Sequence, residues 1–340
     1  RMSSMTIGAD GLGLISYQDS GNEDLKVAHC SDTDCTTATI TTLDFTDDVG
    51  RYTSMTIGAD GLGLISYWDN TSDDLKVAHC SDTNCTTATI TTLDSTGSVG
   101  YYTSITIGAD GLGLISYYDD TNENLKVAHC SDTNCTTATI TTLDATWTVG
   151  WYTSMTIGAD GLGLISYYDA TNSALKVAHC SDTNCTSATI TALDATGTVG
   201  RYPSITIGAD GLGLISYYDD TSDDLKVAHC SDTNCTSATI TTLDSTDDVG
   251  RYTSMTIGAD GLGLISYYDN TSDDLKVAHC SDTNCTSATI TTLDSTDDVG
   301  RYSSITIGAD GLGLISYWDL SNKNLKVAHC ENAFCSPYFR

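Results

Sequence analysis

The chain has 340 residues, with 14 Lys and Arg against 45 Asp and Glu and a formal net charge of −31. This excess of carboxylates excludes a nucleic-acid partner and disfavours an anionic membrane surface, because both require clustered cationic side chains. No apolar run approaches the roughly 20 residues that span a bilayer, so membrane insertion is excluded as well. The 14 cysteines, an even number, indicate an oxidising compartment, and we predict a secreted or cell-surface protein.

A repeat of 50 residues organises the whole chain. The segment TIGADGLGLISY at residues 6–17 recurs unchanged in all seven copies, as does LKVAHC at residues 25–30. We therefore predict one domain over residues 1–340, built from units at residues 1–50, 51–100, 101–150, 151–200, 201–250, 251–300 and 301–340.

Each unit is predicted to contain four β-strands. In the first unit these are residues 4–9, 12–17, 25–30 and 38–43, called strands a, b, c and d. Asp10-Gly11 suits a two-residue hairpin loop between a and b, because Asp-Gly tolerates the positive φ angles of such turns. Residues 19–24 form a polar b–c loop, Cys30 and Cys35 flank the c–d loop, and the d–a link after Leu43 is the longest connection.

Four-stranded units at this period predict an all-β fold, a seven-bladed β-propeller with four antiparallel strands per blade. The long d–a link is expected to cross from the outer strand of one blade to the inner strand of the next. A β-solenoid and a string of small domains are the alternatives. Unit seven ends in CSPYFR where the other units have a full strand d. We therefore expect a short or missing outer strand in blade seven, formed by residues 336–340 or supplied by residues upstream of Arg1, with Arg1 near the last blade.

The pattern IGADGLGLISYYD…DLKVAHCSDTNC resembles the repeats of bacterial secreted β-propellers built from recently amplified, near-identical blades. The resemblance covers the whole chain and implies the fold and an extracellular setting, without naming an activity. Sialidase-like propellers carry a turn of the pattern S-x-D-x-G. This sequence departs from that pattern, because Gly8 stands two residues before Asp10 in place of Ser.

Every unit contains one C-x4-C pair around the c–d loop. Because antiparallel strands bring such residues face to face, we predict seven disulfides rather than zinc sites. A zinc site using His29 is disfavoured, since His29 and Cys30 point to opposite faces of a strand. The predicted disulfide residues are Cys30, Cys35, Cys80, Cys85, Cys130, Cys135, Cys180, Cys185, Cys230, Cys235, Cys280, Cys285, Cys330 and Cys335.

The repeated His29 and Lys26 are interpreted as structural residues. Seven copies of one environment favour a histidine hydrogen-bonded to a neighbouring strand over a catalytic one. Lys26 is expected to pair with Asp24-type carboxylates. The acidic loops make calcium a candidate cofactor, because calcium takes several oxygen ligands. A solvated acidic surface is the simpler interpretation, and it requires no cofactor. The calcium candidates are Asp69, Asp73, Asp74, Asp297 and Asp298.

The copies differ mainly at positions 18–24 and 45–51 of the unit, in the b–c and d–a loops. In an up-and-down blade these loops share one side of the ring, here called the variable face. The a–b turns and c–d loops form the opposite, uniform face. Aromatic residues and arginines on the variable face are the predicted ligand-binding residues, although they could instead fill the gaps between blades. They are Trp68, Tyr118, Tyr168, Tyr218, Tyr268 and Trp318 at position 18, and Arg51, Tyr101, Trp151, Arg201, Arg251 and Arg301 at position 51.

These features favour an extracellular, non-catalytic binding module that recognises a glycan or an extracellular protein. A structural cell-surface or matrix component is the second hypothesis, and an extracellular hydrolase with an Asp-based site is the third. No Ser-His-Asp order, HExxH or phosphate-binding glycine loop is present, so no catalytic residue is predicted. The sequence does not identify the ligand or the oligomeric state.

Overall fold

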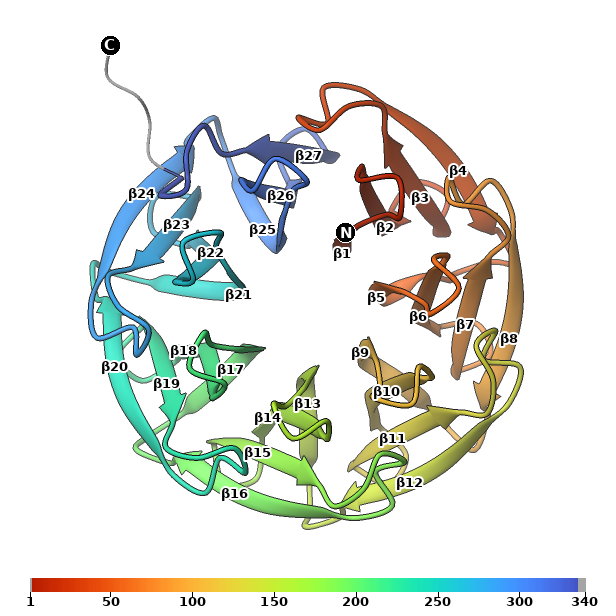
Figure 1. The fold of residues 1–340 in the computed structure, drawn as a ribbon, viewed down its shortest axis with the longest axis horizontal. Coiled ribbons are helices and arrows are strands. Elements are labelled where there is room, and N and C mark those ends of the chain that lie inside the picture. Colours follow the sequence, from red (N-terminus) through yellow and green to blue (C-terminus); the bar gives the residue numbers. More distant parts are fainter. Residues whose placement is uncertain (1, 336–340) are drawn as a thin grey trace.

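The computed structural model describes residues 2–335, which form a ring of β-sheets around a central axis (Figure 1). Among these residues, six sheets have four antiparallel strands and the last has three. The predicted seven-bladed propeller is confirmed, including the incomplete last sheet. The predicted outer strand at residues 336–340 and the position of Arg1 lie outside the described residues. The described residues contain no helix that is long and apolar enough to cross a bilayer.

Each blade follows the order a, b, c, d from the axis outward, with every strand paired to its chain neighbours. Blade 1 has β1 (Ser3–Ile7), β2 (Gly13–Asp19), β3 (Asp24–Cys30) and β4 (Ala38–Asp44). Blade 2 has β5 (Arg51–Ile57), β6 (Gly63–Asp69), β7 (Asp74–Cys80) and β8 (Ala88–Asp94). Blade 3 has β9 (Val99–Ile107), β10 (Gly113–Asp119), β11 (Asn124–Cys130) and β12 (Ala138–Asp144). Blade 4 has β13 (Val149–Ile157), β14 (Gly163–Asp169), β15 (Ala174–Cys180) and β16 (Ala188–Asp194).

The remaining blades repeat this arrangement. Blade 5 has β17 (Val199–Ile207), β18 (Gly213–Asp219), β19 (Asp224–Cys230) and β20 (Ala238–Asp244). Blade 6 has β21 (Val249–Ile257), β22 (Gly263–Asp269), β23 (Asp274–Cys280) and β24 (Ala288–Asp294). Blade 7 has β25 (Val299–Ile307), β26 (Gly313–Asp319) and β27 (Asn324–His329). The chain thus returns to its start, and β25 lies beside β1 (Figure 1).

The a–b turn is larger than the two-residue loop predicted from Asp10-Gly11. The amide of Gly8 donates to the carbonyl of Leu12 over 2.8 Å, and the amide of Gly11 donates to the carbonyl of Gly8 over 2.9 Å. Asp10 Oδ1 accepts from the amide of Leu12. Strand β1 therefore ends at Ile7 and β2 begins at Gly13, and Gly11 takes the positive φ of 82° that a side chain would disfavour.

The hydrophobic core lies between consecutive blades. Leu14 and Val27 of blade 1 pack with Ile65 and Tyr67 of blade 2 in one buried cluster, and similar clusters follow around the ring. A buried polar contact crosses the same interface, because the hydroxyl of Tyr67 donates to Asp44 Oδ2 over 2.6 Å. Its equivalents recur from Tyr117 onward. Each blade is therefore held by its neighbours rather than by a core of its own.

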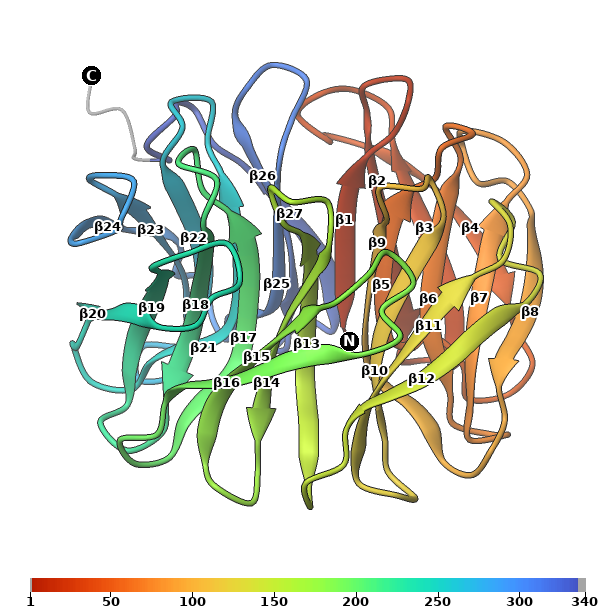
Figure 2. The ribbon, with the colours of Figure 1, turned by 60° about the horizontal axis from the view of Figure 1, so that its bottom comes forward.

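The loops divide between the two ends of the ring as the sequence predicts (Figure 2). On one end, the amide of Val49 in the d–a link donates to the carbonyl of Glu23 in the b–c loop over 2.8 Å. On the other, His29 Nε2 and Asp10 Oδ2 are 2.7 Å apart, which joins strand c to the a–b turn. The b–c loops and d–a links therefore form the variable face, and the a–b turns belong to the uniform face.

All seven predicted disulfides are present, with Cα–Cα separations of 4.7–4.9 Å. The described residues contain no free cysteine. This cysteine usage indicates an oxidising, extracellular environment.

Candidate functional site

A cavity of about 350 Å³ lies on the axis of the ring. Its size falls within the range of small-ligand sites, roughly 300–1,000 Å³. The walls are formed by the residues at positions 52 and 53 of the repeat. These residues lie near the start of each inner strand, at the variable-face end of the ring. None of the lining residues carries a formal charge, although the protein has a net charge of −31. The lining residues are Met2, Ser3, Tyr52, Thr53, Tyr102, Thr103, Tyr152, Thr153, Tyr202, Pro203, Tyr252, Thr253, Tyr302 and Ser303.

Six tyrosines form an arc around this cavity, and Met2 takes the seventh place. From Tyr52 to Tyr302, neighbouring ring centroids are 4.2–4.5 Å apart and neighbouring planes are inclined by 46–61°. The inclination is close to one seventh of a full turn, as the ring symmetry requires. At these separations and inclinations the neighbouring rings contact one another in tilted or edge-on arrangements.

These tyrosines adopt an unusual backbone conformation. All six have φ between 51° and 55°, in the left-handed region that bulky side chains disfavour. The strand register shifts at this point, between Arg51 and Ser54 in blade 2, which is the mark of a β-bulge. Such conformations cost on the order of 1–3 kcal/mol each and cluster at functional sites. The Cys35-type residues share this conformation, so the strain alone does not single out the tyrosines. Their position around the cavity makes the tyrosine arc the first candidate for a binding site.

Five phenols of the arc have raised pKa values and stay protonated under ordinary conditions. Burial raises the pKa of Tyr102 far above its usual value, and the nearby phenols of Tyr52 and Tyr152 raise it further. Burial is also the largest cause of the raised pKa values of Tyr52, Tyr152, Tyr202 and Tyr302. The cavity therefore offers neutral hydroxyl groups, which donate and accept hydrogen bonds.

The residues at position 51, which precede the arc tyrosines, are half-buried and mostly form one of two kinds of contact. Arg201 is an exception, because Thr198 takes the place of the carboxylate and Arg201 pairs with Asp220 instead. In polar joints an arginine bridges a carboxylate and a ring. Arg251 Nη2 is 2.8 Å from Asp248 Oδ2, and its guanidinium lies 5.1 Å from the Tyr218 ring. The joint of Arg301, Asp298 and Tyr268 is equivalent. The carboxylate partners of Arg51, Arg251 and Arg301 are thus the Asp48-type residues.

Aromatic joints replace the polar ones between blades 2 and 4. The Trp68 and Tyr101 rings lie 3.9 Å apart, and Tyr118 and Trp151 lie 6.1 Å apart. Ser98 and Thr148 stand there in place of the Asp48-type carboxylate, and no arginine occupies position 51. Trp68 Nε1 has no hydrogen-bond partner among the described residues.

The residues predicted at position 18 are buried and do not line the cavity, which agrees with the alternative that they fill gaps between blades. Trp68 and Trp318 are 3% and 8% exposed, and Tyr268 is 0% exposed. They lie on the strands before the b–c loops, where they pack against position 51 of the same or the following blade. They support the wall of the site rather than line it. Tyr118, Tyr168 and Tyr218 share this burial.

Trp147 is the most exposed large apolar side chain on this face, at 78%. It sits in a d–a link at φ 69°, a position that Asp or Gly occupies in the other links. The following residue, Thr148, receives a hydrogen bond from the amide of Ala170 over 3.0 Å. Residues 170–174, ATNSA, form the one b–c loop of the sequence without a charged residue. We call residues 147–151 and 170–174 the neutral sector.

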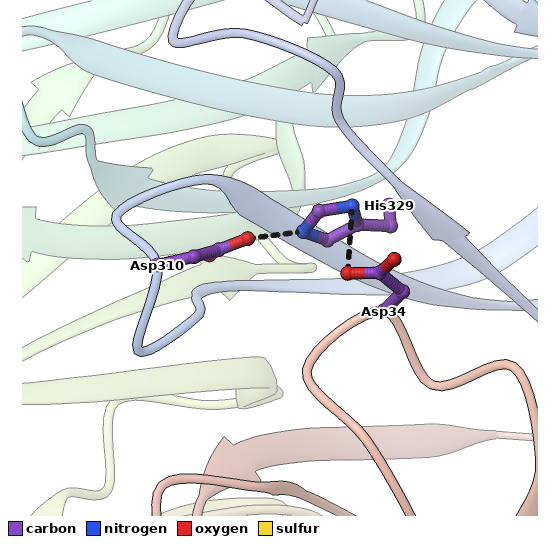
Figure 3. A group of neighbouring side chains, drawn as sticks. All are labelled: Asp34, Asp310 and His329. Atoms are coloured by element: carbon purple, nitrogen blue, oxygen red, sulfur yellow. Dashed lines mark hydrogen bonds and ion pairs between the residues drawn. The ribbon is translucent and has the colours of Figure 1, made fainter.

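The calcium candidates are not gathered into a cluster. Asp69 Oδ2 lies 2.6 Å from Lys76 Nζ, and Asp298 is engaged by Arg301. Within residues 2–335, the group of metal-ligating side chains is Asp34, Asp310 and His329, whose ligand atoms lie within 4.8 Å of one another (Figure 3). It lies on the uniform face and contains none of the candidates.

Two interpretations of the repeated polar residues need correction. Lys26 pairs with Asp19 rather than with Asp24-type residues, and Lys126 lies 2.9 Å from Asp119 and 3.2 Å from Asp94 of the preceding blade. His29-type residues bind the Asp10-type carboxylate of the a–b turn rather than a neighbouring strand. Both contacts are repeated structural interactions.

The sequence analysis did not identify the tyrosine arc as a channel wall. It left Tyr52-type rings as filler between blades, because nothing in a β-pattern shows a bulge that turns a side chain to the axis. One signal was available, since Tyr persists at this position in six copies within a segment that otherwise varies.

No family model and no curated protein sequence matches the chain. Several solved structures share its fold. The NanB sialidase from Streptococcus pneumoniae has 10% identity over 96% of this chain and 67% of its own, with a TM-score of 0.54. The intramolecular trans-sialidase from Ruminococcus gnavus has 12% identity over 99% of this chain and 95% of its own, with a TM-score of 0.53. A puromycin hydrolase has 10% identity over 98% of this chain and 55% of its own, with a TM-score of 0.58. At such identities the likeness shows a β-propeller fold shared with glycan-active enzymes, and it assigns no site.

Proposed function

We propose that the protein is a non-catalytic extracellular binding module whose variable face takes an uncharged glycan at the mouth of the central channel. The observation that carries the proposal is the arc of six strained tyrosines around an uncharged cavity of about 350 Å³.

The chemistry of the cavity selects the ligand class. Neutral phenols offer hydroxyl groups that both donate and accept, which suits a ligand rich in hydroxyl groups. Neighbouring rings of the arc lie only 4.4–4.5 Å apart, so a quaternary ammonium group does not fit between them. An uncharged sugar fits these conditions better than a cation.

An anionic ligand is disfavoured by the pairing of the arginines. Arg51, Arg251 and Arg301 each hold an Asp48-type carboxylate, and Arg201 Nη1 lies 3.4 Å from Asp220 Oδ2. A second carboxylate or a sulfate would have to compete with these partners against a net charge of −31.

Trp147 supplies a stacking surface on the variable face, in the link that leads into the inner strand β13. An exposed indole packs well against the C–H face of a sugar ring, because it buries a large apolar area while leaving the hydroxyl groups at the edge in contact with water. Residues 170–174 next to it add no charge that would have to be desolvated. A glycan of several sugar units would therefore enter the channel at the tyrosine arc and extend over the neutral sector.

The test is an array of neutral and acidic oligosaccharides probed with the wild-type protein, followed by titration of the best neutral probe. Trp147→Ala is expected to weaken binding about tenfold, from the loss of a stacking contact of about 1.4 kcal/mol. Tyr152→Phe, which removes a hydroxyl group and keeps the ring, is expected to weaken it about threefold to tenfold.

Phe45→Ala is the matched control, because Phe45 is 74% exposed on the same face but lies among the acidic residues of a different link. It should leave binding unchanged. Binding of acidic probes alone, equal losses in all three variants, or cleavage of the probe would each contradict the proposal, and cleavage would favour a hydrolase.

A further inference from the structure

The contact between blade 7 and blade 1, here called the seam, differs from the other six joints between blades. Its inner part is regular. The amide of Met5 donates to Ser304 Oγ over 3.0 Å, just as the amide of Met55 donates to Ser4 Oγ. Its outer part is not, because β27 has no fourth strand beside it within residues 2–335. Leu325 is half-buried there, whereas its equivalents in the other blades are fully buried.

Each blade has a histidine on its c strand, and one ring nitrogen of each is already engaged. In all seven copies Nε2 lies 2.7–2.8 Å from the Asp10-type carboxylate of the same blade. The other side of the ring faces position 34 of the next blade. The Phe334 ring of blade 7 lies 4.8 Å from the His279 ring of blade 6. At the seam, Asp34 Oδ1 of blade 1 lies 3.7 Å from Nδ1 of His329 of blade 7 (Figure 3).

Position 34 separates blade 1 from the others. Blades 2–6 have asparagine there, at Asn84, Asn134, Asn184, Asn234 and Asn284, and blade 7 has Phe334. Asp34 is the one carboxylate at this position in the sequence, and it falls where the ring closes. The imidazolium ion carries a proton on both ring nitrogens. It is therefore the form of histidine that complements a carboxylate on each side of the ring.

We propose that Asp34 and His329 form an ionic latch that marks blade 1 as the closing partner of blade 7. Near-identical blades create a problem that this contact addresses. Because blades 2–6 share almost all of their interface residues, the edge of blade 7 could equally accept another blade of the same or a second molecule, and such swapping is the characteristic failure of repeat proteins. A charge placed on one blade alone distinguishes the correct partner.

The same three side chains could be taken for a cation site, but the repeat argues against it. The pair of a histidine and an Asp10-type carboxylate occurs in all seven blades. In six of these blades the next blade has no carboxylate at position 34. At the seam, Asp34 adds one carboxylate near Nδ1 of His329, the ring nitrogen that Asp310 does not contact. The added carboxylate completes an ion pair with His329 and does not require a metal.

The test replaces Asp34 with the residue of the other blades. In Asp34→Asn, hydrogen–deuterium exchange of β1 and β27 at low salt is expected to become about twofold to fivefold faster, as suits the loss of one exposed ion pair. The fraction of swapped dimer after refolding should also rise. Because salt screens such pairs, the difference should vanish at about 1 M NaCl. Asp34→Glu should restore part of the protection.

Asn84→Asp is the matched control, since it adds the same carboxylate beside His29 at a joint that the d–a link already closes. It should leave exchange at the seam and the dimer fraction unchanged. The proposal fails if Asp34→Asn exchanges and refolds like the wild type, or if both variants change the seam equally. A wild-type protein that EDTA converts to the behaviour of Asp34→Asn would show a cation site instead of a latch.

Discussion

The polar joints and the aromatic joints hold consecutive blades at the same backbone positions by different chemistry. Where the Asp48-type residue is a carboxylate, as in Asp248 and Asp298, position 51 is arginine and the ring at position 18 accepts its guanidinium. Where it is Ser98 or Thr148, position 51 is aromatic and stacks instead. The aromatic joint of Tyr118 and Trp151 adds no charge beside Trp147, although Thr148 Oγ1 donates to the Glu123 carboxylate of the neighbouring b–c loop over 2.6 Å. The difference between the joints thus creates the neutral sector without changing the fold.

Acid should affect both kinds of joint alike, because both share the buried contact of tyrosine with the carboxylate at the end of strand d. Burial opposes ionisation of Asp294, but hydrogen bonds from Lys326, Thr296 and Tyr317 outweigh it and lower its pKa to about 2. The pKa values of Asp94 and Asp144 are lowered in the same way, by hydrogen bonds that outweigh burial.

A depressed carboxyl pKa stabilises the folded state above the unfolded value near 3.9, and that stability is lost as the pH falls through the folded pKa. We therefore expect the ring to keep its stability from pH 7 to about 4 and to lose it between about 4 and 2. Near- and far-UV circular dichroism against pH would measure this. Loss of structure above pH 5 would show that other groups dominate.

Truncation of an aromatic joint should give the largest effect of a single substitution. Trp68 is 3% exposed and packs on Tyr101 and Tyr52. Trp68→Ala is expected to lower the free energy of unfolding by about 3–5 kcal/mol, because it removes a buried side chain and leaves a cavity. Chemical denaturation would measure this. Trp147→Ala, at an exposed indole, should change stability by less than about 0.5 kcal/mol. Equal losses of unfolding free energy in the two variants would mean that the buried Trp68 and the exposed Trp147 contribute equally to stability, which would contradict this distinction.

Neutralising a polar joint should have a smaller and salt-dependent effect. Asp248 accepts from Arg251 and from the hydroxyl of Tyr218, which is 2.9 Å away. Asp248→Asn is expected to cost about 1–3 kcal/mol, because both partners lose the charged acceptor. The difference from the wild type should shrink as salt is raised. Thr148→Ala, at the equivalent position of an aromatic joint, should show no such salt dependence. A salt effect of equal size in both variants would remove the distinction between the joints.

The fold followed from the sequence because its determinants are local and repeated. The period, the Asp10-Gly11 turn and the C-x4-C pairs each act within a few residues, and the d–a link fixes the order of strands. The site did not follow to the same extent. Whether an aromatic at position 18 is exposed depends on the neighbouring blade, and the orientation of Tyr52 depends on a bulge that no residue pattern marks. Such features arise from packing between blades, which a single repeat does not encode.

The central claim is that an uncharged glycan occupies the tyrosine arc and the neutral sector. Hydrogen–deuterium exchange of the wild-type protein, with and without the best neutral oligosaccharide from the array, tests it most directly. We expect slower exchange in residues 146–152 and 170–174 and at the starts of the inner strands that carry the arc, with no change in the a–b turns or c–d loops. Protection confined to the uniform face, or to the outer strands, would contradict the account.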